Sequence, residues 1–207
     1  FHPLKVGRVI ARPFLGDNSG TFFRTKNRKD YTFLPPNKTL CDLVVENNRS
    51  CHAIGKIADI FSNRGISTSV SGLSDDALFY KMIDVIKKAK NGDLIFANFV
   101  EFDSLYGHRR DVAGYASALE RFDLKLVKLL EIINPNDFLI ITADHGNDPT
   151  FKGTDHTREK VPVLMVGNYA QKGNNGNIVF SDVGATMAAF LNLSGKLKGT
   201  NIFNDNN

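Results

Sequence analysis

The stretch that decides the fold is residues 142–162, TADHGNDPTFKGTDHTREKVP. An apolar run at 138–141 leads into it, and turn-forming residues follow Asp144 and His145, so this pair is expected just past the end of a strand. Open α/β sheets carry their ligand sites at that position. His156 follows after a short loop. Carboxylate and imidazole side chains together suit a divalent transition metal, although an isolated pair is more often a solvated turn.

The same arrangement occurs earlier in the chain, where the apolar run 94–100 ends in EFDSLYGHRRD. Asp103 and His108 are five residues apart, a spacing that needs a turn rather than one regular helix face to bring both to one ion. Gly107 permits such a turn. Three of the chain's five histidines therefore fall in two clusters that follow strands and are rich in Asp. A metal centre explains that distribution better than chance scatter.

The rest of the chain alternates apolar runs with helical patterns, which predicts an α/β fold with a mainly parallel sheet flanked by helices. With 42% hydrophobic residues the chain has ample material for a core. Strands are expected at 6–11, 51–54, 94–100, 138–143 and 161–166. Helices are expected after Thr39, at 57–61, from Ser74 or Asp75 to 90, at 111–133 and at 182–191.

Composition excludes several classes of protein. No apolar stretch approaches the roughly 18 to 20 residues that a membrane crossing needs, and no signal pattern opens the chain, which predicts a soluble, cytoplasmic protein without a membrane partner. The net charge is +4, but the basic residues are dispersed and no recognition motif accompanies them, so no nucleic-acid partner is expected. Cys41 and Cys51 are expected to be reduced structural residues, with a disulfide as the alternative. Phe1 in place of Met suggests that the natural chain begins earlier.

Several motifs are similar to those of the phosphopentomutases, members of the alkaline phosphatase superfamily. They are VGRVIARPF near the start, DSLYGHRRD, TADHGNDPT and GTDHTRE. The run DHGNDP followed by GTDHTREKVP is the most specific, and the resemblance extends from about residue 6 to about residue 200. It implies that residues 1–34 are the end of a substrate-binding cap domain and that 35–207 are the C-terminal part of an alkaline phosphatase-like core.

The resemblance also implies an activity and a ligand set. The activity is the interconversion of (deoxy)ribose 1-phosphate and (deoxy)ribose 5-phosphate through a phosphothreonine enzyme and a sugar bisphosphate. Two divalent ions, manganese in this family, are implied. Asp103, His108 and His156 resemble the ligands of one ion, and Asp144 with His145 those of the second. Asp155, Arg109, Arg110 and Arg158 flank them, where they could orient the ligands.

Basic side chains near the start could hold a substrate phosphate, because guanidinium groups present paired donors. From the residues alone a solvated surface is an equal alternative. The resemblance favours substrate contacts by Arg8, Ile10 and one or more of Arg12, Arg24 and Arg28. It also places a phosphate-binding lysine at Lys56, which is expected at a strand-to-helix turn.

The chain departs from the family pattern in one respect. Phosphopentomutases carry a further aspartate ligand and a nucleophilic threonine before the cap, and neither segment is in this sequence, so no catalytic residue is assigned. The N-terminal half of the same protein is expected to complete the site. Two alternatives stay open: another metal-dependent phosphohydrolase or mutase, for example phosphoglycerate mutase-like, and a noncatalytic metal-binding fragment.

Overall fold

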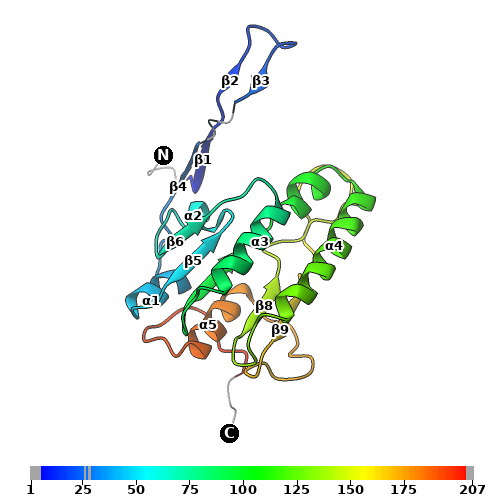
Figure 1. The fold of residues 1–207 in the computed structure, drawn as a ribbon. Helices are drawn as coiled ribbons and strands as arrows, with labels where there is room; N and C mark the ends of the chain where they lie inside the picture. The colour runs from blue at the N-terminus through cyan, green and yellow to red at the C-terminus, as the bar shows by residue number, and fades with distance from the viewer. Residues whose placement is uncertain (1–5, 26, 28, 204–207) are drawn as a thin grey trace.

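The computed structural model describes residues 6–25, 27 and 29–203, and a parallel sheet lies at its centre (Figure 1). Strand β5 (Cys51–Ile54) pairs in parallel with β6 (Thr68–Val70) on one side and β7 (Leu94–Ala97) on the other. Helices flank this sheet, which confirms the predicted α/β class. The C-terminal ends of β5 and β7 point to the same edge, as parallel pairing requires.

Three of the helices begin where the sequence places capping residues. Thr39 forms a capping box with Asp42 at the start of α1 (Leu40–Glu46), Ser74 caps α3 (Asp75–Ile86), and Asp111 caps α4 (Val112–Leu130). The described residues also form the α-helices α2 (Ile57–Ile60), which is only four residues long, and α5 (Phe180–Phe190). The predicted helices are thus confirmed, with α3 and α4 ending three or four residues earlier than expected.

The core lies on both faces of the sheet. One buried cluster joins Phe79 and Met82 of α3 to Ile54 of β5 and Leu129 of α4. A second cluster contains Cys41, Val44, Cys51 and Leu191. Both cysteines are buried and carry free thiols, which confirms that they are reduced structural residues.

Two strands differ from the expected parallel arrangement. Strands β8 (Leu139–Thr142) and β9 (Val163–Val166) pair antiparallel with each other, with Leu139 opposite Val166. Within the described residues they form a separate two-stranded sheet. The run of apolar residues identified both strands correctly, but such a run carries no information about strand direction. The prediction that they continue the parallel sheet was wrong.

The chain before the core forms an extended arm. Strand β1 (Arg8–Ala11) pairs antiparallel with β4 (Lys29–Thr32), and β2 (Phe14–Leu15) pairs with β3 (Phe23–Arg24) at the far end. The arm rises away from the core in Figure 1 and meets it at Thr32, whose hydroxyl lies 2.6 Å from that of Ser62. The division of the chain into a cap remnant and a core at residue 34 stays a prediction.

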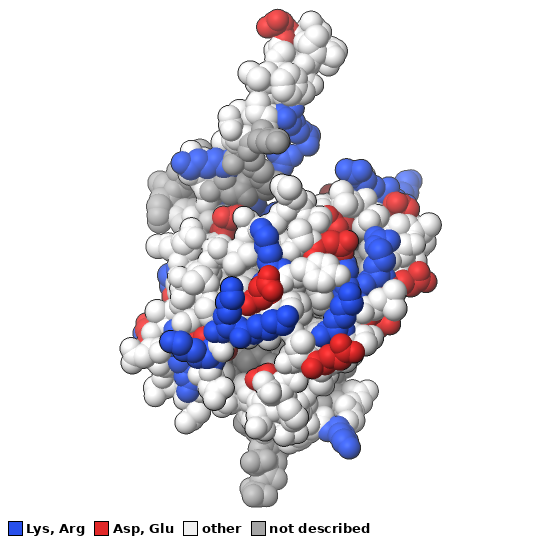
Figure 2. Space-filling view, viewed as in Figure 1, with Lys and Arg blue, Asp and Glu red and all other residues white. Residues whose placement is uncertain are grey.

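The surface over α3 and α4 carries Lys and Arg side chains interleaved with Asp and Glu (Figure 2). None of the helices in the described part of the chain is both long enough and apolar enough to cross a membrane.

Candidate metal centre

A π-helix presents the first pair of predicted ligands. This element, η2 (Phe102–Gly107), lies between β7 and α4, and the N–H of His108 donates to the carbonyl of Asp103 at 2.9 Å. A hydrogen bond between residues five apart closes one π turn, so Asp103 and His108 lie on one face of η2. The expected convergence is present, but it arises from a π-helix rather than from a loop at Gly107.

Three of the predicted ligands converge. Nε2 of His108 lies 3.3 Å from one carboxylate oxygen of Asp103, and Nε2 of His156 lies 3.2 Å from the other. The two Nε2 atoms are 3.1 Å apart. Adjacent ligands of one ion stand roughly 3 to 3.5 Å apart when their bonds are about 2.1 Å long, so these separations fit a divalent ion. The mixed oxygen and nitrogen donors fit one as well.

Backbone carbonyls orient the imidazole rings. Nδ1 of His108 lies 2.6 Å from the carbonyl oxygen of Thr154, and Nδ1 of His145 lies 3.1 Å from that of Gly146. A carbonyl oxygen can only accept a hydrogen bond, so each Nδ1 must carry the proton when it is hydrogen-bonded to the carbonyl. In the neutral ring the lone pair is then on Nε2, the atom that points toward the carboxylates.

His145 joins the same region from the second cluster. Its ring stacks on that of His156 with centroids 3.8 Å apart, and its Nε2 is 3.6 Å from Asp144 Oδ1. Donor atoms of Asp103, His145 and His156 all lie within 4.8 Å of one another. Asp103 and His156 therefore belong both to this group and to the group with His108. Asp144 is the most exposed of the five predicted ligands, with 69% of its side chain accessible.

Asn147 and Arg110 hold the two clusters together. Nδ2 of Asn147 donates to Asp103 Oδ1 at 2.5 Å, and Arg110 Nη1 donates to Asn147 Oδ1 at 2.8 Å. Arg110 also donates to the carbonyls of Gly107, Asp148, Gly153 and Asp155, so it joins η2 to the loop that carries His156. Arg110 was among the residues expected to orient the ligands, but Asn147 was not. In the sequence, only the position of Asn147 directly after the Asp-His-Gly motif pointed to a role at this site.

The pKa of one aromatic residue near the cluster, Tyr115, is raised by burial and by a neighbouring charge. Tyr115 lies on α4, and its ring meets that of Phe102 of η2 at 6.2 Å between centroids. Burial, followed by the negative charge of Asp103, raises the pKa of the Tyr115 hydroxyl above its ordinary value.

The structure does not gather the predicted phosphate-binding residues around this cluster. Arg8 and Ile10 share one exposed face of β1, Arg12 follows directly, and Arg24 lies on β3 at the outer part of the arm (Figure 1). Arg28 lies outside the described residues. Lys56 is exposed at the expected turn between β5 and α2, although α2 has only four residues.

Comparison with known proteins shows which family this chain resembles. The model of the Metalloenzyme superfamily matches residues 45–195. Among curated proteins, the chain is 52% identical over 189 residues to the phosphopentomutase of Sinorhizobium medicae (strain WSM419). It is 47% identical over 192 residues to that of Agrobacterium fabrum (strain C58 / ATCC 33970). These alignments cover 91% and 92% of this chain but 47% of each relative, so the chain spans about half the length of the curated relatives it matches.

A solved structure shares the fold at low sequence identity. The PH0037 protein from Pyrococcus horikoshii superposes with a TM-score of 0.62 and 16% identity. The match covers 85% of this chain and 58% of that protein. At this identity the likeness concerns the fold alone.

Proposed function

We propose, from the premise that the chain belongs to the Metalloenzyme superfamily, that it is the metal-binding portion of a phosphopentomutase. The proposed activity is the interconversion of (deoxy)ribose 1-phosphate and (deoxy)ribose 5-phosphate. The observation that carries the proposal is the convergence of Asp103, His108 and His156 within 3.3 Å in a chain about half identical to proteins named phosphopentomutase. A cytoplasmic location belongs to the same proposal.

Each of the five ligands has a defined part in this proposal. Asp103, His108 and His156 would hold one divalent ion, and Asp144 with His145 would contribute to a second, with manganese as the proposed metal. Such ions, when bound, polarise phosphoryl oxygens and lower the pKa of a hydroxyl nucleophile. Thr154 and Gly146 keep Nε2 of His108 and His145 directed at the site through their carbonyls. Asn147 supports Asp103 from the side.

The substrate is proposed to contact five basic residues and Ile10, all outside the metal cluster. The proposed contacts are Arg8, Ile10, Arg12, Arg24, Arg28 and Lys56. Guanidinium and ammonium groups gain charge-assisted hydrogen bonds to phosphate, so the loss of one weakens binding of the sugar phosphate. Arg8→Ala or Lys56→Ala, in a polypeptide extended to the length of the relatives, is expected to raise KM more than it lowers kcat. An unchanged KM would instead indicate that the substituted residue belongs to a solvated surface and does not contact the substrate.

Transfer of the phosphoryl group is assigned to residues outside this sequence. The phosphothreonine is proposed to lie in the part of the relatives' length that this chain does not cover, so the 207-residue chain with Mn²⁺ is not expected to interconvert pentose phosphates. The extended polypeptide should turn over ribose 5-phosphate and leave phosphoglycerate untouched. Turnover of phosphoglycerate would instead indicate another mutase of the superfamily. Turnover of ribose 5-phosphate by the 207-residue chain would place the nucleophile within it.

A further inference from the structure

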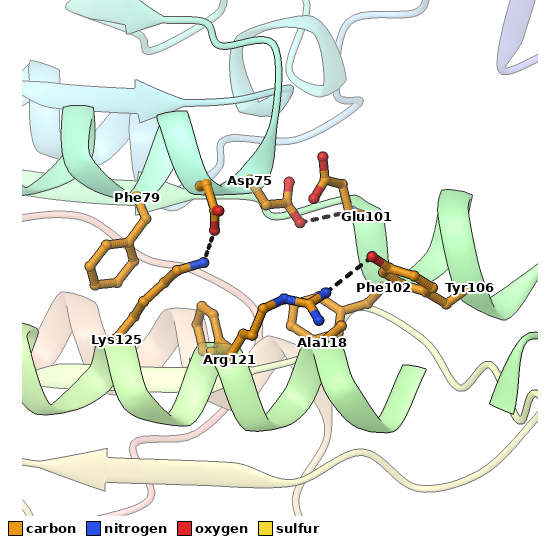
Figure 3. Close-up of a pocket in the computed structure, with 10 residues that line it drawn as sticks. Asp75, Phe79, Glu101, Phe102, Tyr106, Ala118, Arg121 and Lys125 are labelled. Atoms are coloured by element: carbon orange, nitrogen blue, oxygen red, sulfur yellow. Dashed lines mark hydrogen bonds and ion pairs between the residues drawn. The ribbon is translucent and has the colours of Figure 1, made fainter. Parts of the chain in front are cut away.

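A buried carboxylate outside the ligand set holds the start of η2. Asp75 is the first residue of α3 and is 9% exposed. One of its oxygens accepts the N–H of Val100 at 3.0 Å, and the other accepts the N–H of Glu101 at 2.8 Å. Figure 3 shows Asp75 directed at Glu101, where the chain leaves β7 and enters η2.

These two N–H groups are at a helix start that has no cap of its own. The first N–H groups of a helix lack partners within the helix, and a nearby side chain usually accepts from them. For η2 the residue in the capping position is Glu101, whose side chain makes no capping hydrogen bond. From a different helix, one oxygen of Asp75 accepts the N–H of Glu101 in this capping position, and its other oxygen accepts the N–H of Val100, the residue directly before it.

The helix that carries Asp75 does not need this carboxylate. Ser74 already caps α3 by accepting the N–H of Ala77 at 3.2 Å, and Asp76 also supplies an acidic side chain to the first turn. Burial raises the pKa of Asp75 above its ordinary value, even though the N–H groups of Glu101 and Val100 act in the opposite direction. A carboxylate kept buried against this electrostatic cost has a role beyond the stability of α3.

We infer that Asp75 is a positioning residue for the metal centre. It fixes the first turn of η2, and the direction of that turn sets where Asp103 and His108 present their donor atoms. This inference rests on the metal centre in the proposed function and concerns a residue that contacts no ligand side chain. An Asn at position 75 has a single acceptor oxygen, and its amide group would face one of the two N–H donors.

The test compares Asp75→Asn with Asp76→Asn in the 207-residue chain. Both variants remove one negative charge from the same turn of α3, but Asp76 is exposed and is paired with Lys125. Mn²⁺ affinity is measured by calorimetry at a temperature where circular dichroism shows both variants to be folded. The loss of a residue that orients a ligand weakens metal binding by about 10- to 100-fold, which is the result expected for Asp75→Asn. Asp76→Asn should bind within about twofold of the wild type, because it touches neither η2 nor its amides.

Amide hydrogen exchange of the wild-type chain gives a second measurement that does not depend on the folding of a variant. The N–H groups of Val100 and Glu101 should exchange as slowly as those of β7. Exchange at the rate of exposed amides would overturn the inference, and so would Mn²⁺ affinity in a folded Asp75→Asn within about twofold of the wild type. Failure of the wild-type chain itself to bind Mn²⁺ would overturn the proposed metal centre, a different result from either.

Discussion

At the scale of single residues, close packing at Gly107 determines how Asp103 is held. Gly107 is not among the glycines with positive φ, so backbone freedom is not the reason for it. A Cβ at this position would lie 2.3 Å from Nδ2 of Asn147, the atom that donates to Asp103. The absence of a side chain at residue 107 therefore leaves room for the Asn147 side chain that donates to Asp103, a proposed metal ligand.

Gly107→Ala is accordingly expected to displace Asn147 and to weaken Mn²⁺ binding by about 10-fold or more, the range for lost support of a ligand. Calorimetric titration of the 207-residue chain measures the effect. The double variant Gly107→Ala, Asn147→Ala provides the control, because it removes the side chain that the new methyl group meets. Its affinity should equal that of Asn147→Ala alone. Additive losses from the two changes would mean that Gly107 acts independently of Asn147.

At the scale of elements, the sequence predicted what each segment forms better than how the segments pair. Thr39, Ser74 and Asp111 marked helix starts correctly, because capping depends on the local side chain. The π-helix at 102–107 was not predicted, since its hydrogen bonds span five residues and no residue preference marks them. The antiparallel pairing of β8 with β9 was missed because strand direction depends on distant parts of the chain.

For the candidate site as well, the sequence predicted the features that depend on neighbouring residues and missed those that depend on distant contacts. The five residues could be proposed because the sequence shows an apolar run directly before each Asp-His cluster, and ligand sites lie just past strand ends. They are Asp103, His108, Asp144, His145 and His156. Asn147 and Asp75 could not, since each acts through a contact with a residue far away in the sequence, namely Asp103 and Glu101. The substrate contacts of the arm came only from a family resemblance, and they stay predictions.

The first turn of α1 gives the fold a dependence on pH. Burial alone would raise the pKa of Asp42, but hydrogen bonds from Arg64 and Thr39 and the charge of Arg64 outweigh it. The pKa of Asp42 is therefore lower in the folded chain than its ordinary value of 3.8. A carboxyl group of this kind stabilises the fold above that value, and the contribution is lost as the pH falls through the folded pKa.

Urea unfolding of the wild type and Asp42→Asn at several pH values measures this contribution. The wild type should be more stable at pH 7, and the difference between the two unfolding free energies should shrink as the pH falls below about 4. Asp59→Asn serves as a control for the loss of one negative charge, because Asp59 is exposed and has no resolved ion pair among the described residues. A difference that stays constant down to pH 2 would contradict the assigned pKa direction.

At the scale of the whole molecule, apolar side chains remain exposed on α4 and on β9. Val112, Leu119, Val127 and Leu130 lie on one stripe of α4, and each is about half exposed. Leu164 and Val166 lie together on one face of β9 and are 55% and 38% exposed. Several large apolar side chains exposed along one element in this way favour association.

The 207-residue chain is therefore expected to self-associate at micromolar concentration, as sedimentation velocity would show. Leu119→Lys with Val127→Lys should shift the distribution toward the monomer, because two charges then interrupt the stripe. Leu73→Lys is the matched control, since Leu73 is a fully exposed leucine in the loop before α3 and is not part of the stripe on α4. A wild type that stays monomeric at high concentration would show that these side chains are not an interface.

The central claim is that the segments following β7 and β8 build one metal centre, and titration of the chain with Mn²⁺ tests it most directly. His156→Ala is compared with His52→Ala, a histidine that contacts Thr68 and Asp93 away from the cluster. The wild type and His52→Ala should each bind one Mn²⁺ tightly, because Asp103, His108 and His156 supply three ligands and Asp144 with His145 only two. His156→Ala should lose that binding while its circular dichroism stays unchanged. Equal Mn²⁺ binding by His156→Ala and the wild type would contradict the claim.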